Sequence, residues 1–348
     1  MLVVSEKHVD YWTLFADDAR RMGSTLYWRL ASGVQGDETL RAITAGAKRG
    51  QPHANLLLGA VHFLLLRGAQ HKLREFYPNL NGGVAKDGDP FPAFRDFCLA
   101  HRGELEPLIA TRVTNTNEVG RSAILHPGFR VAAEEARAPL HLIEIGPSAG
   151  LNLIWDKYGV RYHKDGKTIA AIAPDAPLVI DCELHGERVP PTGPSPKIAG
   201  RVGLELNPVD LSNADDRDWL RALMWPDQIS RAERLDKAIA LFAQSHVEIR
   251  SGDAVALLPD AMADAPRDAA ICIYHTIALY QFSDKMRGAV EDILTVAGVR
   301  RLVLRLSYEM EKFGGDCALK LIRYHDGTRE ERLLASCHPH GTWIEWRA

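Results

Sequence analysis

The pattern of apolar and polar residues divides the chain into two parts, the first of which is helical. From residue 1 to about 135, apolar residues recur at the spacing of amphipathic helices, beginning with Trp12, Phe15 and Ala19. Short helices are indicated at 39–48 and 91–110, and Gly, Asn, Asp and Pro mark a loop at 77–92. The segment 55–67 is apolar on nearly every face, so we expect it at the centre of this part.

Beyond Pro139 the pattern changes to strand-like apolar runs that alternate with helical ones. The candidate strands are 140–145, 201–206, 247–250, 270–274 and 301–306, with helical runs at 218–224, 230–244 and 283–297. This alternation is typical of a largely parallel sheet. Two last strands, 318–324 and 342–346, are joined by a polar connection with a turn signal at 325–328. We therefore expect an α/β fold, with a Rossmann-like, mostly parallel sheet and an antiparallel C-terminal strand.

A chain of 348 residues exceeds what one hydrophobic core usually organises, so two domains are expected. The pattern places a helical domain at 1–115 and a Rossmann-like domain at 116–348. Within the second domain, the stretch 158–200 breaks the alternation, since two short strand candidates, 168–173 and 178–184, lie among six prolines. We predict an insertion there, formed by a hairpin and a proline-rich loop over one side of the site.

Composition narrows the classes of partner. The net charge of −3 shows no basic bias, so we expect no nucleic-acid surface. The longest apolar run, 56–66, is too short to span a membrane, and the acidic residues near Asp10 are unlike a signal peptide. Five scattered cysteines without a C-x-x-C pair favour free thiols in a reducing compartment. These features predict a cytoplasmic protein with a small-molecule substrate and leave the oligomeric state open.

The turn after strand 140–145 is the first sign of chemistry. It reads Glu144-Ile-Gly146-Pro-Ser148-Ala-Gly150-Leu-Asn152 and leads into an apolar, helix-like run. Such turns bring backbone N–H groups to a ligand at the carboxyl edge of a parallel sheet. The second glycine of the dinucleotide fingerprint G-x-G-x-x-G is missing. The E-x-G-x-x-x-G spacing is instead similar to the first motif of the S-adenosylmethionine (SAM) methyltransferases, so we expect these five residues to contact SAM.

Later strand ends offer further groups for such a ligand. Glu205 ends a strand before Asn-Pro, and its carboxylate is the preferred acceptor for ribose hydroxyls, with Asp181 as the alternative. Asp253 follows a strand and a glycine, so it is a candidate for the adenine amino group, with the Ala254 backbone beside the ring. The same Asp253 could instead only cap the following helix.

The fourth strand ends in His275 and Thr276, a polar pair at the expected ligand crevice. His275 is the candidate catalytic base, and it could also orient a substrate or be a structural histidine. Asn117, Arg121, Tyr158 and Thr276 are the candidates to bind substrate. His338 and His340 lack a third ligand at a recognisable spacing, so no metal site is expected.

These segments together resemble the DUF2332 family of uncharacterised bacterial proteins, which is related to the SAM methyltransferase superfamily. The resemblance lies in 144–153, Trp155-Asp-Lys-Tyr158, 201–210, 219–226, 231–235, Gly252-Asp253 and His275-Thr276, together with Thr114-Asn-Thr-Asn-Glu-Val-Gly-Arg121. The resemblance implies SAM binding at Gly146, Gly150, Glu205 and Asp253. In our leading hypothesis, the N-terminal helical domain covers the carboxyl edge of the sheet.

We therefore expect a SAM-dependent methyltransferase acting on an unknown small molecule. Two alternatives remain at this point. One is a non-catalytic, methyltransferase-like scaffold that binds a nucleotide metabolite or a protein partner. The other is a nicotinamide-dependent oxidoreductase, which the Gly146–Gly150 spacing disfavours.

Overall fold

The computed structural model describes residues 10–312 and 314–348. Two of the polar residues near Asp10 that are unlike a signal peptide, Glu6 and His8, lie outside the described residues. The chain divides into two compact units. The first combines Met1–Thr116 with Val209–Glu233, and the second combines Asn117–Pro208 with Arg234–Ala348. The sequence placed two consecutive domains on either side of residue 115. The structure differs in that residues 209–233 return to the first unit.

The first unit is helical and is built around α4 (His53–Leu66), a helix that is buried on nearly all sides. Trp219 and Leu223 belong to the same core, and a Cβ on Gly59 of α4 would lie 3.0 Å from the Leu223 Cδ2 atom. The central place predicted for 55–67 is thereby confirmed. The remaining elements are α1 (Tyr11–Arg21), α2 (Thr25–Gln35), α3 (Glu38–Ile43), η1 (Lys72–Phe76), η2 (Pro78–Leu80), α5 (Phe91–Ala100), α6 (Arg102–Thr111) and α8 (Ala214–Ala222). Helix α9 (Ile229–Phe242) starts in this unit and continues in the second.

The second unit is a mixed α/β unit built on one large, mostly parallel sheet. The strands are β1 (Leu140–Ile145), β2 (Gly159–Lys164), β3 (Lys167–Ile172), β4 (Val179–His185), β5 (Ile198–Glu205), β6 (Glu248–Ser251), β7 (Ala270–Thr276), β8 (Val303–Met310), β9 (Cys317–His325), β10 (Thr328–Cys337) and β11 (Trp343–Trp346). Their order is β3-β2-β4-β11-β10-β9-β8-β7-β1-β5-β6. The five strands from β6 to β8 are parallel to one another, and β8 pairs antiparallel with β9 on its other side.

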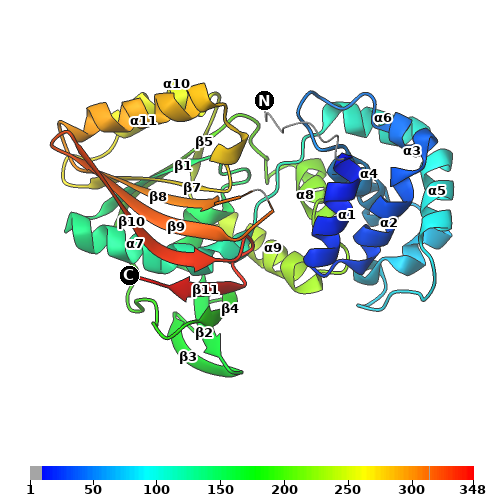
Figure 1. Cartoon of the computed structure of the whole chain (residues 1–348), viewed down its shortest axis with the longest axis horizontal. Helices are drawn as coiled ribbons and strands as arrows, with labels where there is room; N and C mark the ends of the chain where they lie inside the picture. Colours follow the sequence, from blue (N-terminus) through cyan, green and yellow to red (C-terminus); the bar gives the residue numbers. More distant parts are fainter. Residues whose placement is uncertain (1–9, 313) are drawn as a thin grey trace. The chain divides into compact units, whose positions relative to one another are not determined.

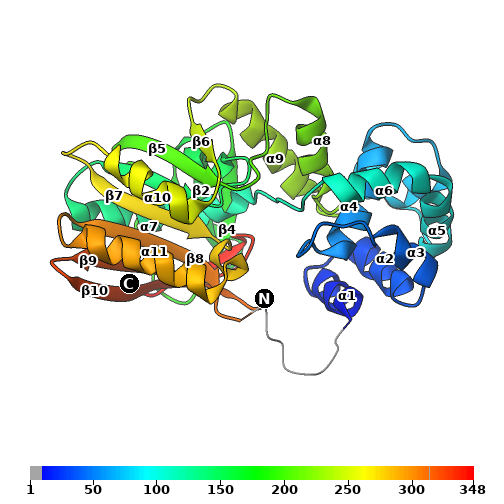
Figure 2. The same ribbon diagram turned by 90° about the horizontal axis from the view of Figure 1, so that it is seen from above.

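Helices cover both faces of this sheet. Figures 1 and 2 show α7 (Ser122–Ala136) on one face and α10 (Ala254–Ala263) with α11 (Asp284–Gly298) on the other. Because side chains alternate along a strand, Ile143 and Ile145 pack with the α10–α11 core. On the opposite face, Phe129 of α7 meets Tyr274 with ring centroids 4.9 Å apart.

Three local features differ from the sequence expectations. The run after the glycine turn is a short 3-10 helix, η4 (Leu151–Lys157), with a kink at Ile154, because the chain must enter β2 at Gly159. The predicted insertion exists but is part of the sheet, since β2 pairs with β3 and β4, and β4 pairs with β11. The polar connection before the last strand is itself a strand, β10, whose hairpin with β9 confirms the turn predicted at 325–328. Across the described residues, no helix is long and apolar enough to cross a membrane.

Candidate ligand site at the carboxyl edge of the sheet

The strand order fixes where a ligand site is expected in the second unit. After β1 the chain forms β2, β3 and β4 at one end of the sheet. It then returns to form β5 and β6 on one side of β1, and afterwards β7 and β8 on the other side. The order therefore reverses between β1 and β7, and open α/β sheets bind ligands at the carboxyl ends of the strands beside such a reversal. Glu144 and Thr276 lie at these two strand ends.

The glycine turn closes this edge tightly. Gly146 has φ +71° and Gly150 has φ +81°, a region that glycine occupies without strain. A Cβ on Gly146 would lie 2.9 Å from the Cβ of Ala278, and one on Gly150 would lie 2.9 Å from Ile249 Cδ1. Their N–H groups donate to Leu204 and Pro147, respectively. The glycines thus let the turn pack against its neighbours, and the protein itself uses these two donors.

Glu205 is tied to the same turn. Its Oε2 accepts the N–H of Ser148 at 2.8 Å, and its Oε1 accepts the N–H of Asn207 at 3.0 Å. Ser148 is buried and has φ +57°, so this bond holds a conformation that is uncommon for a residue with a side chain. A carboxylate offers about four acceptor positions. Two of them have no hydrogen-bond partner on Glu205 among the described residues.

Glu144 is buried on the face that carries Tyr274, whose hydroxyl donates to Glu144 Oε2 at 2.8 Å. Burial raises the pKa of Glu144 to about 8, and the negative charge of Glu205 adds to this. The hydrogen bond from Tyr274 and the positive charge of Arg121 act in the opposite direction. Glu144 is therefore mostly a neutral acid at pH 7, held next to the turn.

Asp253 caps the N-terminus of α10, which is the alternative role that the sequence analysis gave it. Its Oδ1 accepts the N–H of Val255 at 2.8 Å, while the residue as a whole is exposed. Ala254 is buried at the start of the helix. The N–H of Gly252, one residue earlier, donates to the Glu205 carbonyl, so the ends of β5 and β6 are joined at this edge.

Three of the predicted contact residues bind other parts of the protein. Asn117 Oδ1 accepts the N–H of Leu151 at 2.9 Å, and Asn152 Oδ1 accepts the hydroxyl of Ser122 at 3.1 Å. The Tyr158 hydroxyl donates to the Leu151 carbonyl at 2.8 Å, and its ring is buried. These contacts hold η4 in place next to the glycine turn. The buried Asn152 Nδ2 has no hydrogen-bond partner among the described residues.

Arg121, at the end of η3 (Val119–Arg121), reaches the end of β7. Its Nη1 donates to the Thr276 carbonyl at 2.8 Å and lies 3.3 Å from the Thr276 hydroxyl, while its Nε donates to the Pro339 carbonyl at 2.9 Å. The structure thus brings together two residues that the sequence assigned to substrate binding. Arg121 is half-buried.

His275 has both ring nitrogens in use. Arg305 Nε is 3.0 Å from His275 Nε2, and His275 Nδ1 is 2.6 Å from Glu309 Oε1. Since Arg305 only donates, Nε2 must accept, and Nδ1 carries the proton that goes to Glu309. The ring is fully buried and burial lowers its pKa, so the neutral form persists. This geometry favours the structural alternative over the catalytic one that the sequence suggested.

Glu309, at the carboxyl end of β8, was not singled out from the sequence. Its Oε1 accepts the N–H groups of Ala278 (2.9 Å) and Leu279 (3.1 Å) as well as the His275 proton. Burial alone would raise the pKa of Glu309, but these hydrogen bonds keep it below its usual value. An acid at the end of an apolar strand was the available signal, the same one that identified Glu205.

The alternative ribose carboxylate, Asp181, lies elsewhere. It belongs to β4, which is separated from β1 by β11, β10, β9, β8 and β7. Its carboxylate is exposed and pairs with Arg161 and His163 at 2.9 and 2.7 Å. The structure therefore leaves Glu205 as the strand-end acid beside the glycine turn.

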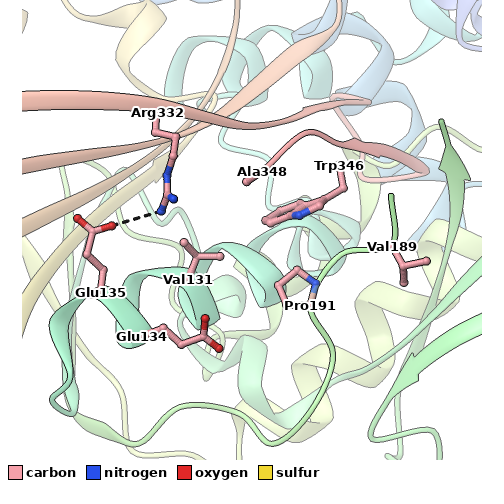
Figure 3. Close-up of a pocket in the computed structure, with 8 residues that line it drawn as sticks. All are labelled: Val131, Glu134, Glu135, Val189, Pro191, Arg332, Trp346 and Ala348. Carbon is pink, nitrogen blue, oxygen red and sulfur yellow. Dashed lines mark hydrogen bonds and ion pairs between the residues drawn. The ribbon is translucent and has the colours of Figure 1, made fainter. Parts of the chain in front are cut away.

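A concavity lies beside α7, away from the carboxyl edge of the sheet. It is a groove of about 570 Å³ lined by Val131, Glu134, Glu135, Val189, Pro191, Arg332, Trp346 and Ala348. Figure 3 shows the Arg332–Glu135 ion pair at one end of the groove and Val189 toward the other. None of the predicted site residues lines it. Within the described residues, no group of three or more potential ligands is arranged to hold a metal ion.

Comparison with protein-family models decides the relationship of the chain. Residues 10–346 match the model described as an uncharacterized protein conserved in bacteria (DUF2332). The chain belongs to the DUF2332 family. Comparisons with curated proteins and with solved structures gave no match. The DUF2332 match covers both compact units. Because the family is uncharacterized, the site at the carboxyl edge must be interpreted from its own geometry.

Proposed function

We propose that this DUF2332 protein is a SAM-dependent methyltransferase acting on a small molecule, with SAM bound at the carboxyl edge of the sheet. The observation that carries the proposal is the surface formed by the ends of β5 and β6. Glu205 retains two acceptor positions there for ribose hydroxyls. The exposed Asp253 carboxylate, at the end of the neighbouring strand, is available to the adenine amino group.

Leu206 supports the same reading. It directly follows Glu205 and is 67% exposed, so its side chain is accessible to a ligand at this edge. An apolar side chain between two strand-end carboxylates suits the face of an aromatic base, which has polar edges and an apolar surface. Its contact with the adenine ring would remove this exposed surface from water.

The other half of the site is suited to alignment. Bound SAM supplies a methyl group that is already activated by its sulfonium, so positioning can account for much of the catalysis. The turn after β1 packs closely against the turn after β7, where Gly146 meets Ala278, at the point where the strand order reverses. Arg121 and Thr276 lie next to it at the end of β7 and would orient the acceptor. Proton transfer by His275 is not part of this proposal.

A second candidate is a non-catalytic scaffold that binds a nucleotide metabolite. It is favoured by the turn itself, since the N–H groups of Gly146, Ser148 and Gly150 are already bonded within the protein. Both candidates require nucleoside binding at Glu205. They differ in whether a methyl group is transferred, so they must be separated by a turnover measurement.

Calorimetric titration with SAM and S-adenosylhomocysteine tests the proposal. We expect Leu206→Ala to weaken S-adenosylhomocysteine binding about five- to thirtyfold, because roughly 1–2 kcal/mol of apolar contact is lost. Leu333→Ala on β10, which removes another partly exposed leucine (40%), is the matched control and should bind as the parent protein does. Asp181→Asn should also bind normally.

Two results would contradict the proposal. If the parent protein shows neither heat nor a thermal shift with millimolar SAM, the edge does not bind this cofactor, because a bound ligand must stabilise the native state. If SAM binds but no methyl group from labelled SAM reaches any compound in a metabolite extract, the scaffold is the better description.

A further inference from the structure

A single turn after β7 is held from two sides by groups of opposite charge. Glu309 accepts the N–H groups of Ala278 and Leu279, while Arg121 donates to the carbonyl of Thr276. Ile277, between them, has φ +53°, which a β-branched residue seldom adopts. Both charged residues are thus fastened to the turn that packs against Gly146.

Each of the two groups keeps an unused polar atom. Glu309 Oε2 is buried and has no hydrogen-bond partner among residues 10–312 and 314–348. Arg121 uses Nε and Nη1, and no described residue accepts from its Nη2. No ion pair joins Arg121 to Glu309 in the described part of the chain, although both charges influence the pKa of Tyr280.

A buried carboxylate oxygen without a donor is unfavourable by more than a typical hydrogen bond contributes. A nearby guanidinium nitrogen with no acceptor adds the complementary requirement, since guanidinium favours carboxylates. One chemical group satisfies both: an α-amino acid, whose ammonium donates and whose carboxylate accepts. A purely anionic group would satisfy only the guanidinium, and a neutral group such as water would leave both charges uncompensated.

We propose that Glu309 and Arg121 form a binding site for a zwitterionic α-amino-acid group, Glu309 taking the ammonium and Arg121 the carboxylate. The inference rests on the proposed function, because the group belongs either to SAM or to an amino-acid-like methyl acceptor bound beside it. The position at the ends of β7 and β8 is distinct from the nucleoside surface on β5 and β6.

Glu309→Gln is the decisive variant, because its amide oxygen keeps the three contacts of Oε1 while an NH₂ group replaces Oε2. Glu311→Gln, at an exposed glutamate two residues along, is the control. Calorimetry is performed with S-adenosylhomocysteine and with methylthioadenosine, which lacks the amino-acid part. Loss of at least about tenfold in affinity for the first alone, equivalent to about 1.4 kcal/mol, assigns the group to SAM.

A second arm covers the acceptor. Saturation-transfer NMR with the twenty L-amino acids, in the presence of saturating S-adenosylhomocysteine, should show binding to the parent protein and none to Glu309→Gln. Equal losses for both nucleosides, or unchanged affinities with no amino-acid signal, would overturn the site and leave a buried water as the partner of Oε2. If Glu309→Gln does not fold, Arg121→Lys is measured in both arms. A parent protein that binds neither nucleoside contradicts the proposed function instead.

Discussion

At the scale of single residues, Glu144 links the site to stability. An acid whose pKa is about 8 in the folded state, against an ordinary value of 4.5, binds a proton more tightly when folded. The folded state is therefore most favoured below pH 4.5, and its advantage decreases as the pH rises through 8. The loss occurs between these two pH values, which is opposite to the behaviour of a carboxylate in an ion pair.

Glu144→Gln should remove this dependence, because the amide is neutral at every pH and its oxygen still accepts from Tyr274. We expect the variant to gain stability over the parent protein between pH 5.5 and pH 8.5, by a few kcal/mol at most. Urea unfolding at the two pH values measures the difference. A constant offset between the two proteins would show that Glu144 is ionised throughout.

The strand-end carboxylates show how far the sequence leads at this scale. Glu144 and Glu205 were found because each is an acid that ends an apolar run, and the structure places both at the glycine turn. The hydrogen-bond partners of His275 could not be predicted from the sequence, because Arg305 and Glu309 lie on a strand about thirty residues further along the chain. Strand pairing alone brings these side chains together, and no local pattern encodes it.

At the scale of elements, the contact between two turns is the main determinant of the edge. Gly146 and Ala278 come from different strands, and a Cβ at Gly146 would overlap a backbone-attached atom that cannot rotate away. Gly166, in the β2–β3 hairpin, has nearly the same φ (+73°) with no atom within 4 Å of its Cβ position. A side chain at Gly166 would meet only backbone strain, whereas one at Gly146 would meet both backbone strain and a steric overlap.

Gly146→Ala should therefore be more destabilising than Gly166→Ala, by more than about 1 kcal/mol, and should weaken S-adenosylhomocysteine binding by displacing the turn after β7. The Gly166 variant should carry only the cost of its positive φ and bind normally. Denaturant unfolding and calorimetry on both proteins check this. Equal losses would mean that the two turns separate easily.

Elements were predicted well where the pattern was simple. The strands β1, β5, β6, β7 and β8 follow apolar runs and were located within a few residues. Strand β10 was missed because six of its ten residues are exposed, among them Arg329, Glu330, Glu331 and Arg332, so it has no apolar run. Strand β10 forms because it pairs antiparallel with β9 across the turn, and its own side chains do not indicate this pairing.

At the scale of the whole molecule, the first unit depends on a distant segment. Trp219 and Leu223 lie in its core, the Ala222 carbonyl is 2.9 Å from His62 Nδ1, and Asp227 Oδ2 accepts from Ser24 and Leu26. No periodicity within 1–115 indicates this return, which is why the sequence suggested a simple division into two segments.

A fragment of residues 1–116 should consequently be unfolded or molten alone, since its core lacks the α8 side chains and the contacts of His62 Nδ1 with Ala222 and of the Ser24 hydroxyl with Asp227 are lost. The same fragment joined to residues 209–233 by a Gly-Ser linker should fold cooperatively. Thermal melts followed by circular dichroism and the dispersion of NMR spectra compare them. A cooperative transition in the shorter fragment would refute the dependence.

The pairing of β4 with β11 has a consequence for synthesis on the ribosome. Trp343, Ile344 and Glu345 are the register partners of Glu183, Leu184 and His185, which leave the exit tunnel about 160 residues earlier. At typical elongation rates of roughly 5–20 residues per second, about 8–32 seconds pass between the synthesis of β4 and that of its partner β11. An open strand edge of this kind attracts other chains. Nascent chains of this protein are thus exposed to aggregation through the β4 edge until residues 343–345 have been made.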